Sequence, residues 1–394
     1  MNEITKQFIR ENLNADVPTL ALKKAPVGTD VSLALRQIAA RQLLQKKVPQ
    51  WAENEDLLFP VHLSIEQCSS EASAKYKAEQ LEGQGFADLT GGLGVDTYYI
   101  SQHFQQTDYV ERQSELCDLA KHNFTILDAD IKVWNETAED YLMHCEPKDC
   151  IFIDPARRDE HGHKTVSIAD CTPDVGALQD LLLQKAERVM IKLSPMLDIN
   201  KALTELHHVK EVHVVAVANE CKELNFVLER DYQVEAQFIC VNLLTYQPEV
   251  RFTMQEERNC ICSIADGVSK YLYEPNPALM KAGCFKLLTE RYNVFKLHKN
   301  SNLYTSEQMI SDFPGRIFEV EGWSHYNKKL KQTLLPDVDK ASIAVRNFPL
   351  SVAELRKALK IGDGDVVYLF ATTLKGEERV VIRTKKPPQS KRSV

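Results

Sequence analysis

Residues 85–96, which read G-F-A-D-L-T-G-G-L-G-V-D, constrain the fold more than any other stretch of the chain. A short apolar run ends at Asp88, and residues 95–104 have the spacing of a helix. A strand, a glycine-rich turn and a helix within about twenty residues form a unit whose backbone N–H groups can face a ligand. Glycine also serves tight turns without a ligand, so the stretch alone leaves both uses open. The three turn glycines are Gly91, Gly92 and Gly94.

From residue 86 onward, short apolar runs alternate with helical segments. This alternation predicts an α/β fold in which a mainly parallel sheet is covered by helices on both faces. The runs 223–228 and 237–244 have no clear helix between them, so an antiparallel edge is expected there. The other strands are expected at 86–89, 109–110, 131–133, 150–153, 189–192 and 212–217, and the helices at 95–104, 114–124, 137–144, 174–185 and 199–207.

The segments on either side of this region have different patterns. The first 80 residues are expected to be helical, with helices at 32–48 and 70–81, Gly83 after the second of these, and Ser64 with Gln67 as a capping box. We expect five parts in all. They are a helical N-terminal region at 1–80, an α/β domain at 81–255, two small α+β modules at 256–315 and 316–386, and a disordered basic tail at 387–394.

Within the C-terminal modules, turn and capping residues predict the elements. Asn276 and Pro277 are expected to begin a helix that ends near Tyr292. Ser351 and Glu354 form a capping box for a helix at 351–360. Further elements are expected as strands at 271–273, 294–297, 302–304, 317–320, 342–346, 366–371 and 379–383 and as a helix at 324–334.

Composition excludes several classes of protein. Hydrophobic residues make up 44% of the 394 residues and charged residues 26%, which is ordinary for a soluble globular protein. The N-terminus has no apolar core typical of a signal peptide, and a cytoplasmic protein is expected. The ten cysteines lack C-x-x-C spacing, so we expect no metal and no disulfide framework. Cys260 and Cys262 are expected to share one face of a strand.

The net charge of −8 is unevenly distributed. Residues 323–394 contain 15 Lys and Arg against 7 Asp and Glu, a net of +8, which leaves 33 against 49 in the first 322 residues, a net of −16. A basic C-terminal part on an acidic body suggests an anionic partner, while a solvated charged surface is the alternative.

The residues after two later strands indicate which ligand the turn would hold. The turn has no Gly-Lys-Ser/Thr, so an NTPase is not expected. Glu111 ends the second strand about twenty residues later, where a carboxylate can accept the hydroxyl groups of a ribose. The fourth strand ends in the sequence 154–158, D-P-A-R-R, at the edge of the sheet where ligands bind.

This combination resembles the class I S-adenosylmethionine (SAM)-dependent methyltransferases over about residues 65–245. The chain keeps the acid of their first motif as Asp88 and has Thr90 at the first glycine. The resemblance implies a Rossmann-like sheet, SAM as cofactor, Asp88 ordering the turn, and Glu111 holding the ribose. The adenine contact stays open among Glu136, Thr137 and Ala138. The cofactor-binding residues that it implies are Asp88, Thr90, Gly91, Gly92, Gly94, Glu111 and Arg112.

The order of short motifs is similar to a bacterial family in which the methyltransferase domain precedes a ferredoxin-like and a THUMP-like module. The motifs are C-S-S-E at 68–71, D-L-T-G-G at 88–92, D-P-A-R-R at 154–158, S-P-M-L-D at 194–198, E-C-K-E at 220–223 and Y-L-Y-E-P-N at 271–276. THUMP domains bind RNA, which agrees with the basic C-terminal part. The candidate RNA contacts are Arg158, Lys328, Lys329 and Lys331.

Asp154, Pro155 and Arg157 are the candidate catalytic residues. Amino-methylating relatives carry [D/N]-P-P-[Y/F/W] after the fourth strand, and this chain has Ala156 and Arg157 at the last two places. Two arginines suit a phosphate or carboxylate better than a stacked base. Carbon-5 methylation would need a cysteine, for which only Cys171 and Cys221 are near.

We therefore expect a SAM-dependent methyltransferase acting on structured RNA (rRNA or tRNA). The alternatives are a methyltransferase for a protein or small anionic substrate, and a non-catalytic RNA-binding protein with a vestigial SAM site. Several polar residues have two interpretations, substrate contact or structure: His161 and His163, Asp198, Glu220, and the basic and aromatic residues of 281–304.

Overall fold

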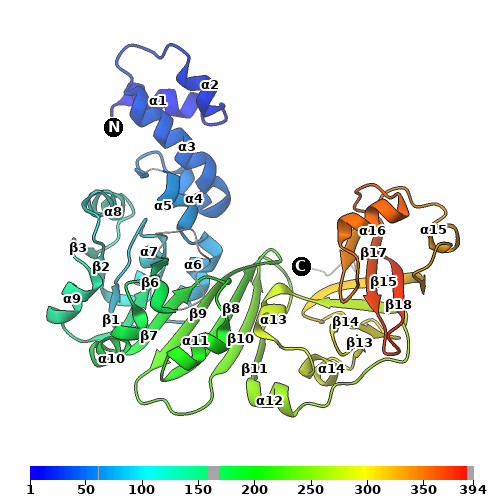
Figure 1. Cartoon of the computed structure of the whole chain (residues 1–394). Coiled ribbons are helices and arrows are strands. Elements are labelled where there is room, and N and C mark those ends of the chain that lie inside the picture. Colours follow the sequence, from blue (N-terminus) through cyan, green and yellow to red (C-terminus); the bar gives the residue numbers. More distant parts are fainter. Residues whose placement is uncertain (61, 158–167, 388–394) are drawn as a thin grey trace. The chain divides into compact units, whose positions relative to one another are not determined.

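The computed structural model describes the chain except residues 61, 158–167 and 388–394. Arg158, His161, His163 and the predicted tail, apart from its first residue Pro387, therefore lie outside the described residues. The chain forms two compact units (Figure 1). The first contains Met1–Val212 and Glu223–Val234, and the second contains His213–Lys222 and Glu235–Val394.

The N-terminal region of the first unit is helical, as predicted. Capping fixes its helices: Asp30 accepts a hydrogen bond from Leu33 N (3.0 Å), and Ser70 accepts one from Ser73 N (3.2 Å). The predicted capping box at Ser64 is wrong, because that residue lies inside a helix that begins at His62. The helices are α1 (Glu3–Glu11), α2 (Val17–Ala21), α3 (Val31–Lys47), α4 (Pro49–Glu53), α5 (His62–Gln67) and α6 (Glu71–Ala78).

A mainly parallel sheet follows, which confirms the predicted α/β Rossmann-like fold. Its strands in the first unit have the order β9-β7-β4-β1-β2-β3, and β9 is antiparallel to β7 while the others are parallel. The strands are β1 (Gly83–Asp88), β2 (Phe104–Val110), β3 (Ile131–Trp134), β4 (Lys148–Ile153), β7 (Ala186–Leu193) and β9 (Glu220–Glu229). The helices are α7 (Val95–Ser101), α8 (Ser114–Ile126), α9 (Ala138–His144), α10 (Val175–Lys185) and α11 (Ile199–Glu205).

Two predicted boundaries in this region are wrong. The helix expected to reach residue 104 ends at Ser101, because Phe104 begins β2 and stacks on Phe86 of β1 with ring centroids 5.1 Å apart. The helix expected to reach residue 81 ends at Ala78, and Gly83 opens β1. A small two-stranded sheet of β5 (Ala156–Arg157) and β6 (Cys171–Thr172), with a 3₁₀ turn at Ile168–Asp170, follows β4.

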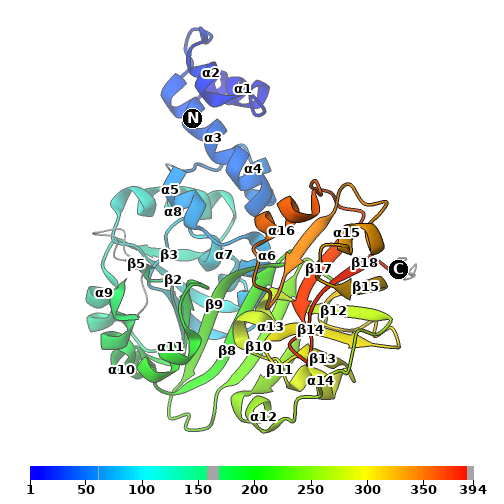
Figure 2. The same cartoon turned by 45° about the vertical axis from the view of Figure 1, so that its right-hand side comes forward.

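The second unit contains a sheet with the order β13-β14-β12-β15-β18-β17-β16 in the described chain, antiparallel except for β16 and β17. Helix α16 lies beside β17 of this sheet (Figure 2). Its Leu355 and Leu359 belong to a buried cluster with Leu369 of β17. The unit also holds β10 (Gln237–Leu243), β11 (Val250–Thr253), α12 (Met254–Asn259) and part of β8 (Val209–Val217). The remaining elements are β12 (Tyr271–Pro275), α13 (Pro277–Ala282), α14 (Leu287–Arg291), β13 (Phe295–His298), β14 (Ser301–Ser306), β15 (Gly315–His325), α15 (Leu330–Thr333), β16 (Ser342–Val345), α16 (Val352–Leu359), β17 (Tyr368–Thr373) and β18 (Arg379–Lys385).

Here too the structure confirms some predictions and corrects others. Asn276 caps α13 and the Ser351–Glu354 capping box is present. The helix expected to reach residue 292 ends at Ala282, because Gly283 adopts a left-handed conformation (φ +79°) and a new helix begins at Leu287.

The helix expected at 324–334 is reduced to α15, because β15 continues to His325 by pairing with β18. Cys260 is the C-cap residue of α12 and is not in a strand, so the predicted strand face of two cysteines is wrong. No helix in the described ranges is long and apolar enough to cross a membrane.

Candidate functional site

A cavity of about 500 Å³ opens at the carboxyl ends of the parallel strands of the first unit. All of its lining residues belong to that unit. Its walls come from the turn after β1, from the segments after β2, β3 and β4, from β7, and from the segment before α6. A volume of this size is in the usual range for a site that binds a cofactor or other small molecule.

Two of the turn glycines are required by packing. A Cβ atom at Gly91 would lie 2.1 Å from Cε2 of Tyr109, and one at Gly94 would lie 2.8 Å from Cζ of Phe124. Gly92 and Gly94 also have positive φ angles of 54° and 84°, which side chains disfavour. At Gly92 the one described atom within 4 Å of such a Cβ is Thr90 O, at 3.7 Å. The turn therefore lies close against β2 and leaves Gly92 open toward the cavity.

Asp88, at the end of β1, orders this turn. Its carboxylate accepts hydrogen bonds from Thr90 N (3.0 Å) and from Thr97 Oγ1 (2.6 Å). Burial raises the pKa of Asp88 to about 7, although both hydrogen bonds act in the opposite direction. The side chain is enclosed, so it supports the cavity wall from behind.

Glu111 connects the end of β2 to the turn. It accepts hydrogen bonds from Gly92 N (3.1 Å) and Gln113 N (2.8 Å), one on each carboxylate oxygen. A carboxylate oxygen can accept two hydrogen bonds, so each retains acceptor capacity for a hydroxyl group. Arg112 is exposed and also lines the cavity.

Thr90, which stands where the resembling family has glycine, connects β1 to β4. Its Oγ1 accepts a hydrogen bond from Asp154 N at 2.6 Å. Glycine could not supply this acceptor. The bond holds the start of the D-P-A-R-R segment against the turn, and Pro155 is buried behind it.

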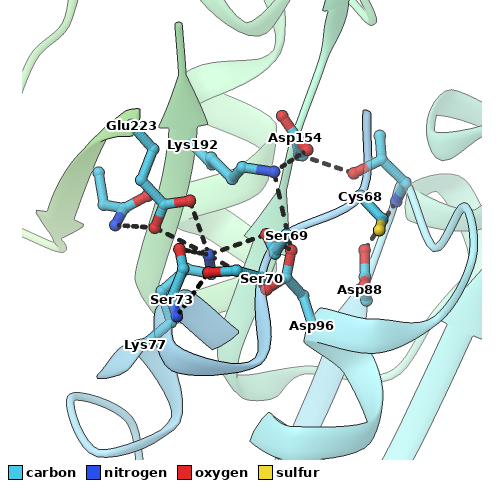
Figure 3. Close-up of polar contacts among 12 residues, drawn as sticks. Cys68, Ser69, Ser70, Ser73, Lys77, Asp88, Asp96, Asp154, Lys192 and Glu223 are labelled. Carbon is cyan, nitrogen blue, oxygen red and sulfur yellow. Dashed lines mark hydrogen bonds and ion pairs between the residues drawn. The ribbon is translucent and has the colours of Figure 1, made fainter. Parts of the chain in front are cut away.

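Lys192 of β7 lines the cavity, and its ammonium lies between Asp154 and Asp96 (Figure 3). Its Nζ is 2.5 Å from Asp154 Oδ2 and 3.8 Å from Asp96 Oδ2. Burial alone would lower the pKa of Lys192, but the carboxylates of Asp154, Asp96 and Glu223 outweigh it and raise the pKa above the ordinary value. Lys192 is therefore a stable ammonium, and the Asp154 side chain, 34% exposed, keeps its other oxygen available to the cavity.

Lys77 of α6 extends this network into the interior (Figure 3). The fully buried ammonium lies 3.1 Å from Asp96 Oδ1 and 2.8 Å from Glu223 Oε1, and it donates to the hydroxyls of Ser69 and Ser73. Ser69 in turn donates to Asp96 Oδ2 (2.7 Å). The C-S-S-E and E-C-K-E motifs thus meet around one lysine.

Residues considered for the adenine contact all line the cavity after β3. Glu136 is 2.7 Å from His144 Nε2, and Thr137 caps α9. Ala138 begins that helix. Cys68 lines the cavity as well, but burial raises the pKa of its thiol to about 11, which makes it a poor nucleophile.

The remaining predicted residues are not among the described residues that line this cavity. Only the backbone of Arg157 is described, in β5. Lys328, Lys329 and Lys331 lie at α15 in the second unit, where Lys331 Nζ donates to Val338 O. Asp198 caps α11, the structural alternative for that residue.

Other residues with two interpretations also have structural roles. Glu220 pairs with Lys222 at 2.7 Å, so a salt bridge accounts for it. Within 281–304, Tyr304 is fully buried and donates to Phe285 O, and Lys296 is buried, whereas Phe295 is exposed. Lys281, Phe285, Lys286 and Tyr292 are half-buried, and Arg291 and Lys299 are exposed, so this mixture is divided between core and surface.

Four charged residues of the site were not singled out from the sequence: Lys77, Asp96, Lys192 and Glu223. A signal was present, since Lys192 interrupts the apolar run V-M-I-K-L and Lys77 lies on the buried side of α6. A buried lysine requires a partner, and its partners are up to 146 positions away.

The fold and cavity define a Rossmann-like protein with a nucleotide-type site at the carboxyl edge of its sheet. Two family models match the second unit, a ferredoxin-like domain at residues 271–314 and a THUMP domain-like model at 315–386. No curated protein matches the chain.

Among solved structures, a protein of Porphyromonas gingivalis W83 named "putative methyltransferase" is 35% identical, with a TM-score of 0.85 over 98% of both chains. The chain therefore belongs to the bacterial family of class I SAM-dependent methyltransferases with appended ferredoxin-like and THUMP-like modules.

More distant structures match this chain with lower scores. An rRNA methylase of Streptococcus thermophilus is 15% identical (TM-score 0.30, 44% of this chain and 99% of that one). A 16S rRNA N2 G1207 methyltransferase of T. thermophilus, solved with AdoMet and guanosine, is 13% identical (TM-score 0.34, 44% and 46%). These similarities are too slight to support an inference about the substrate of this chain.

Proposed function

We propose that this chain transfers the methyl group of SAM to a structured RNA, either rRNA or tRNA. The observation that carries the proposal is the cavity that brings the glycine turn, Glu111 and Asp154 together on one edge of the sheet. SAM, when bound, would supply a methyl group that a nucleophile can take from the positively charged sulfur, which leaves as a neutral thioether.

The residues of the cavity fit such a cofactor. The backbone at Gly92 is open toward the cavity, and the acceptor capacity of Glu111 suits the two hydroxyls of a ribose. Asp88 and Thr90 hold the turn that presents these groups, and exposed Arg112 lies at the rim. Net negative charge beside the cavity also suits a cationic sulfur.

Asp154 is the proposed proton or hydrogen-bond acceptor for the attacking atom. One of its oxygens is held by Lys192, and a third of its side-chain surface is exposed. Because Lys192 is a stable ammonium, it positions Asp154 and does not itself accept a proton. Pro155 and Arg157 complete the segment as proposed substrate-side residues.

Two features of the second unit support an RNA substrate. One is the match to a THUMP domain-like model over residues 315–386. The other is the excess of 15 basic over 7 acidic residues in 323–394. Lys328 and Lys329 are exposed and available for phosphate contact. If the substrate is instead a protein or a small anionic molecule, the experiment described next would reveal it.

Calorimetry with SAM, combined with transfer of tritiated methyl groups to RNA and protein fractions, tests the proposal. We expect Glu111→Gln to weaken SAM binding by about tenfold, because one amide hydrogen would face a backbone donor. Asp154→Asn should bind SAM but lose transfer. Glu115→Gln, which changes an exposed carboxylate four residues later in the first turn of α8, is the matched control. Absence of SAM binding at millimolar concentration, or label in protein alone, would contradict the proposal.

A further inference from the structure

A second cavity, of about 640 Å³, lies entirely within the second unit. It opens where β12 ends, beside the first residue after β16 and the second residue of β15. Its walls combine cationic side chains with apolar ones. Arg316, Arg346 and Lys281 supply the first kind, and Pro275, Pro277 and Met280 the second.

A buried carboxylate holds the two arginines. Glu274 of β12 lies directly opposite Arg316 of β15 in the antiparallel register. Its Oε2 accepts from Arg316 Nε at 2.8 Å and also from Nη2, and its Oε1 is 2.6 Å from Arg346 Nη2. The Glu274 side chain is only 6% exposed, so these contacts fix both guanidinium groups.

The charges do not balance within this cluster. One arginine would neutralise Glu274, so the second arginine leaves one positive charge at the cavity. The arginine side chains are 44% and 39% exposed, and Arg316 Nη1 donates no hydrogen bond to the described part of the chain. Donors held in a fixed direction are therefore left for a ligand.

This arrangement matches a phosphate group. A guanidinium presents paired N–H donors that fit phosphate oxygens, and arginines fixed by a buried partner lose little conformational entropy on binding. The cavity is larger than a phosphate, and its proline and methionine walls suit the less polar parts of an attached nucleoside.

We propose that this cavity binds a phosphate group of an RNA chain. The inference rests on the proposed function, because it takes the substrate RNA as the source of the phosphate. It adds a defined anchoring site in the ferredoxin-like and THUMP-like part, remote in sequence from the methyl-transfer residues.

The test uses the full chain and fluorescence anisotropy with a labelled oligoribonucleotide of mixed sequence. The variant Glu274→Gln/Arg316→Gln/Arg346→Gln removes both guanidinium groups without leaving a buried carboxylate unpaired, and it lowers the net charge by one. Arg379→Gln lowers the charge equally at an exposed position of β18 and is the control. Arg346→Lys keeps the charge and removes the paired donors, in case the triple variant does not fold.

We expect the triple variant to bind the RNA about tenfold more weakly than the control and to show a shallower salt dependence, by about one unit for each phosphate that is no longer bound. Arg346→Lys should fall between them. Equal affinities of the triple variant and the control would overturn the inference. Displacement of the RNA by polyglutamate as readily as by unlabelled RNA would also overturn it. So would binding of inorganic phosphate to the wild type if the triple substitution left the affinity for RNA unchanged.

SAM calorimetry and methyl transfer separate this inference from the proposed function. The triple variant should keep wild-type affinity for SAM and transfer less label to RNA when RNA is limiting. Transfer by the wild type with equal transfer by the triple variant would refute the anchoring site and leave the proposed function intact. Conversely, if the triple variant lost RNA binding and the wild type transferred no methyl group, the anchoring site would stand and the proposed function would be refuted.

Discussion

Lys77→Met tests whether the buried ion network holds the site together. The ammonium of Lys77 is fully buried and lies within 3.1 Å of both Asp96 and Glu223. Methionine has a similar length but no charge, so the two carboxylates would share a buried site with only Lys192 nearby. Removing one partner of a buried pair costs about 3–5 kcal/mol, so we expect a loss of this size in the free energy of unfolding.

A charge-matched double variant makes the test specific. The two lysines and three carboxylates of the network carry a net charge of −1, Lys77→Met makes it −2, and Lys77→Met/Glu223→Gln restores −1. Denaturant unfolding followed by tryptophan fluorescence should show the double variant to be more stable than the single one. The loss should also shrink at acid pH, because burial raises the pKa of Asp96 and the two lysines hold it below its ordinary value, so that Asp96 takes up a proton more readily once Lys77 is gone.

Two outcomes would refute this reasoning. A loss below about 1 kcal/mol in Lys77→Met would mean that solvent or rearrangement compensates the carboxylates. A double variant no more stable than the single one would mean that packing of the lysine stem, and not charge, carries the effect. SAM calorimetry on both variants would then show whether the cavity depends on the network.

Two further predictions concern the turn after β1. Burial raises the pKa of Asp88 to about 7, so the folded state holds a proton that the unfolded state releases near pH 4. As the pH rises from about 4 to 8, the free energy of unfolding should therefore fall by about 4 kcal/mol through this group. Asp88→Asn should flatten that part of the pH profile in thermal unfolding, and an unchanged profile would contradict the assignment. Gly91→Ala should cost about 1–3 kcal/mol and weaken SAM binding, because its Cβ would overlap Tyr109. Gly267→Ala, where no described atom lies within 4 Å of the added Cβ, should change neither, and equal melting temperatures of the two variants would refute the steric argument.

Local sequence patterns were sufficient to predict the order of the helices and strands in the α/β domain and the position of the glycine turn. Asp88, Gly92, Glu111 and Asp154 lie around one cavity because each follows a parallel strand, and such ends meet at one edge. The roles assigned to these residues stay predictions until ligand binding is measured, as do the domain bounds and the cytoplasmic location.

What the sequence did not reveal depends on contacts between distant segments. In the sequence, Thr90 departs from the glycine pattern. The structure explains the threonine, because its hydroxyl accepts a hydrogen bond from Asp154 N. The extension of β15 to His325 depends on its pairing with β18, which outweighs the local helical pattern. Lys77 and Glu223 pair across 146 positions, a distance at which no spacing rule applies.

The Glu274 cluster has a consequence for how this family can evolve and be dissected. Glu274 belongs to the ferredoxin-like match, whereas Arg316 and Arg346 belong to the THUMP-like match. Strands β12 and β15, one from each match, are also neighbours in a single sheet. Residues 315–386 expressed alone would expose the unpaired edge of β15 and lack the partner of two arginines. The two modules are therefore expected to be inherited, and to unfold, as one piece.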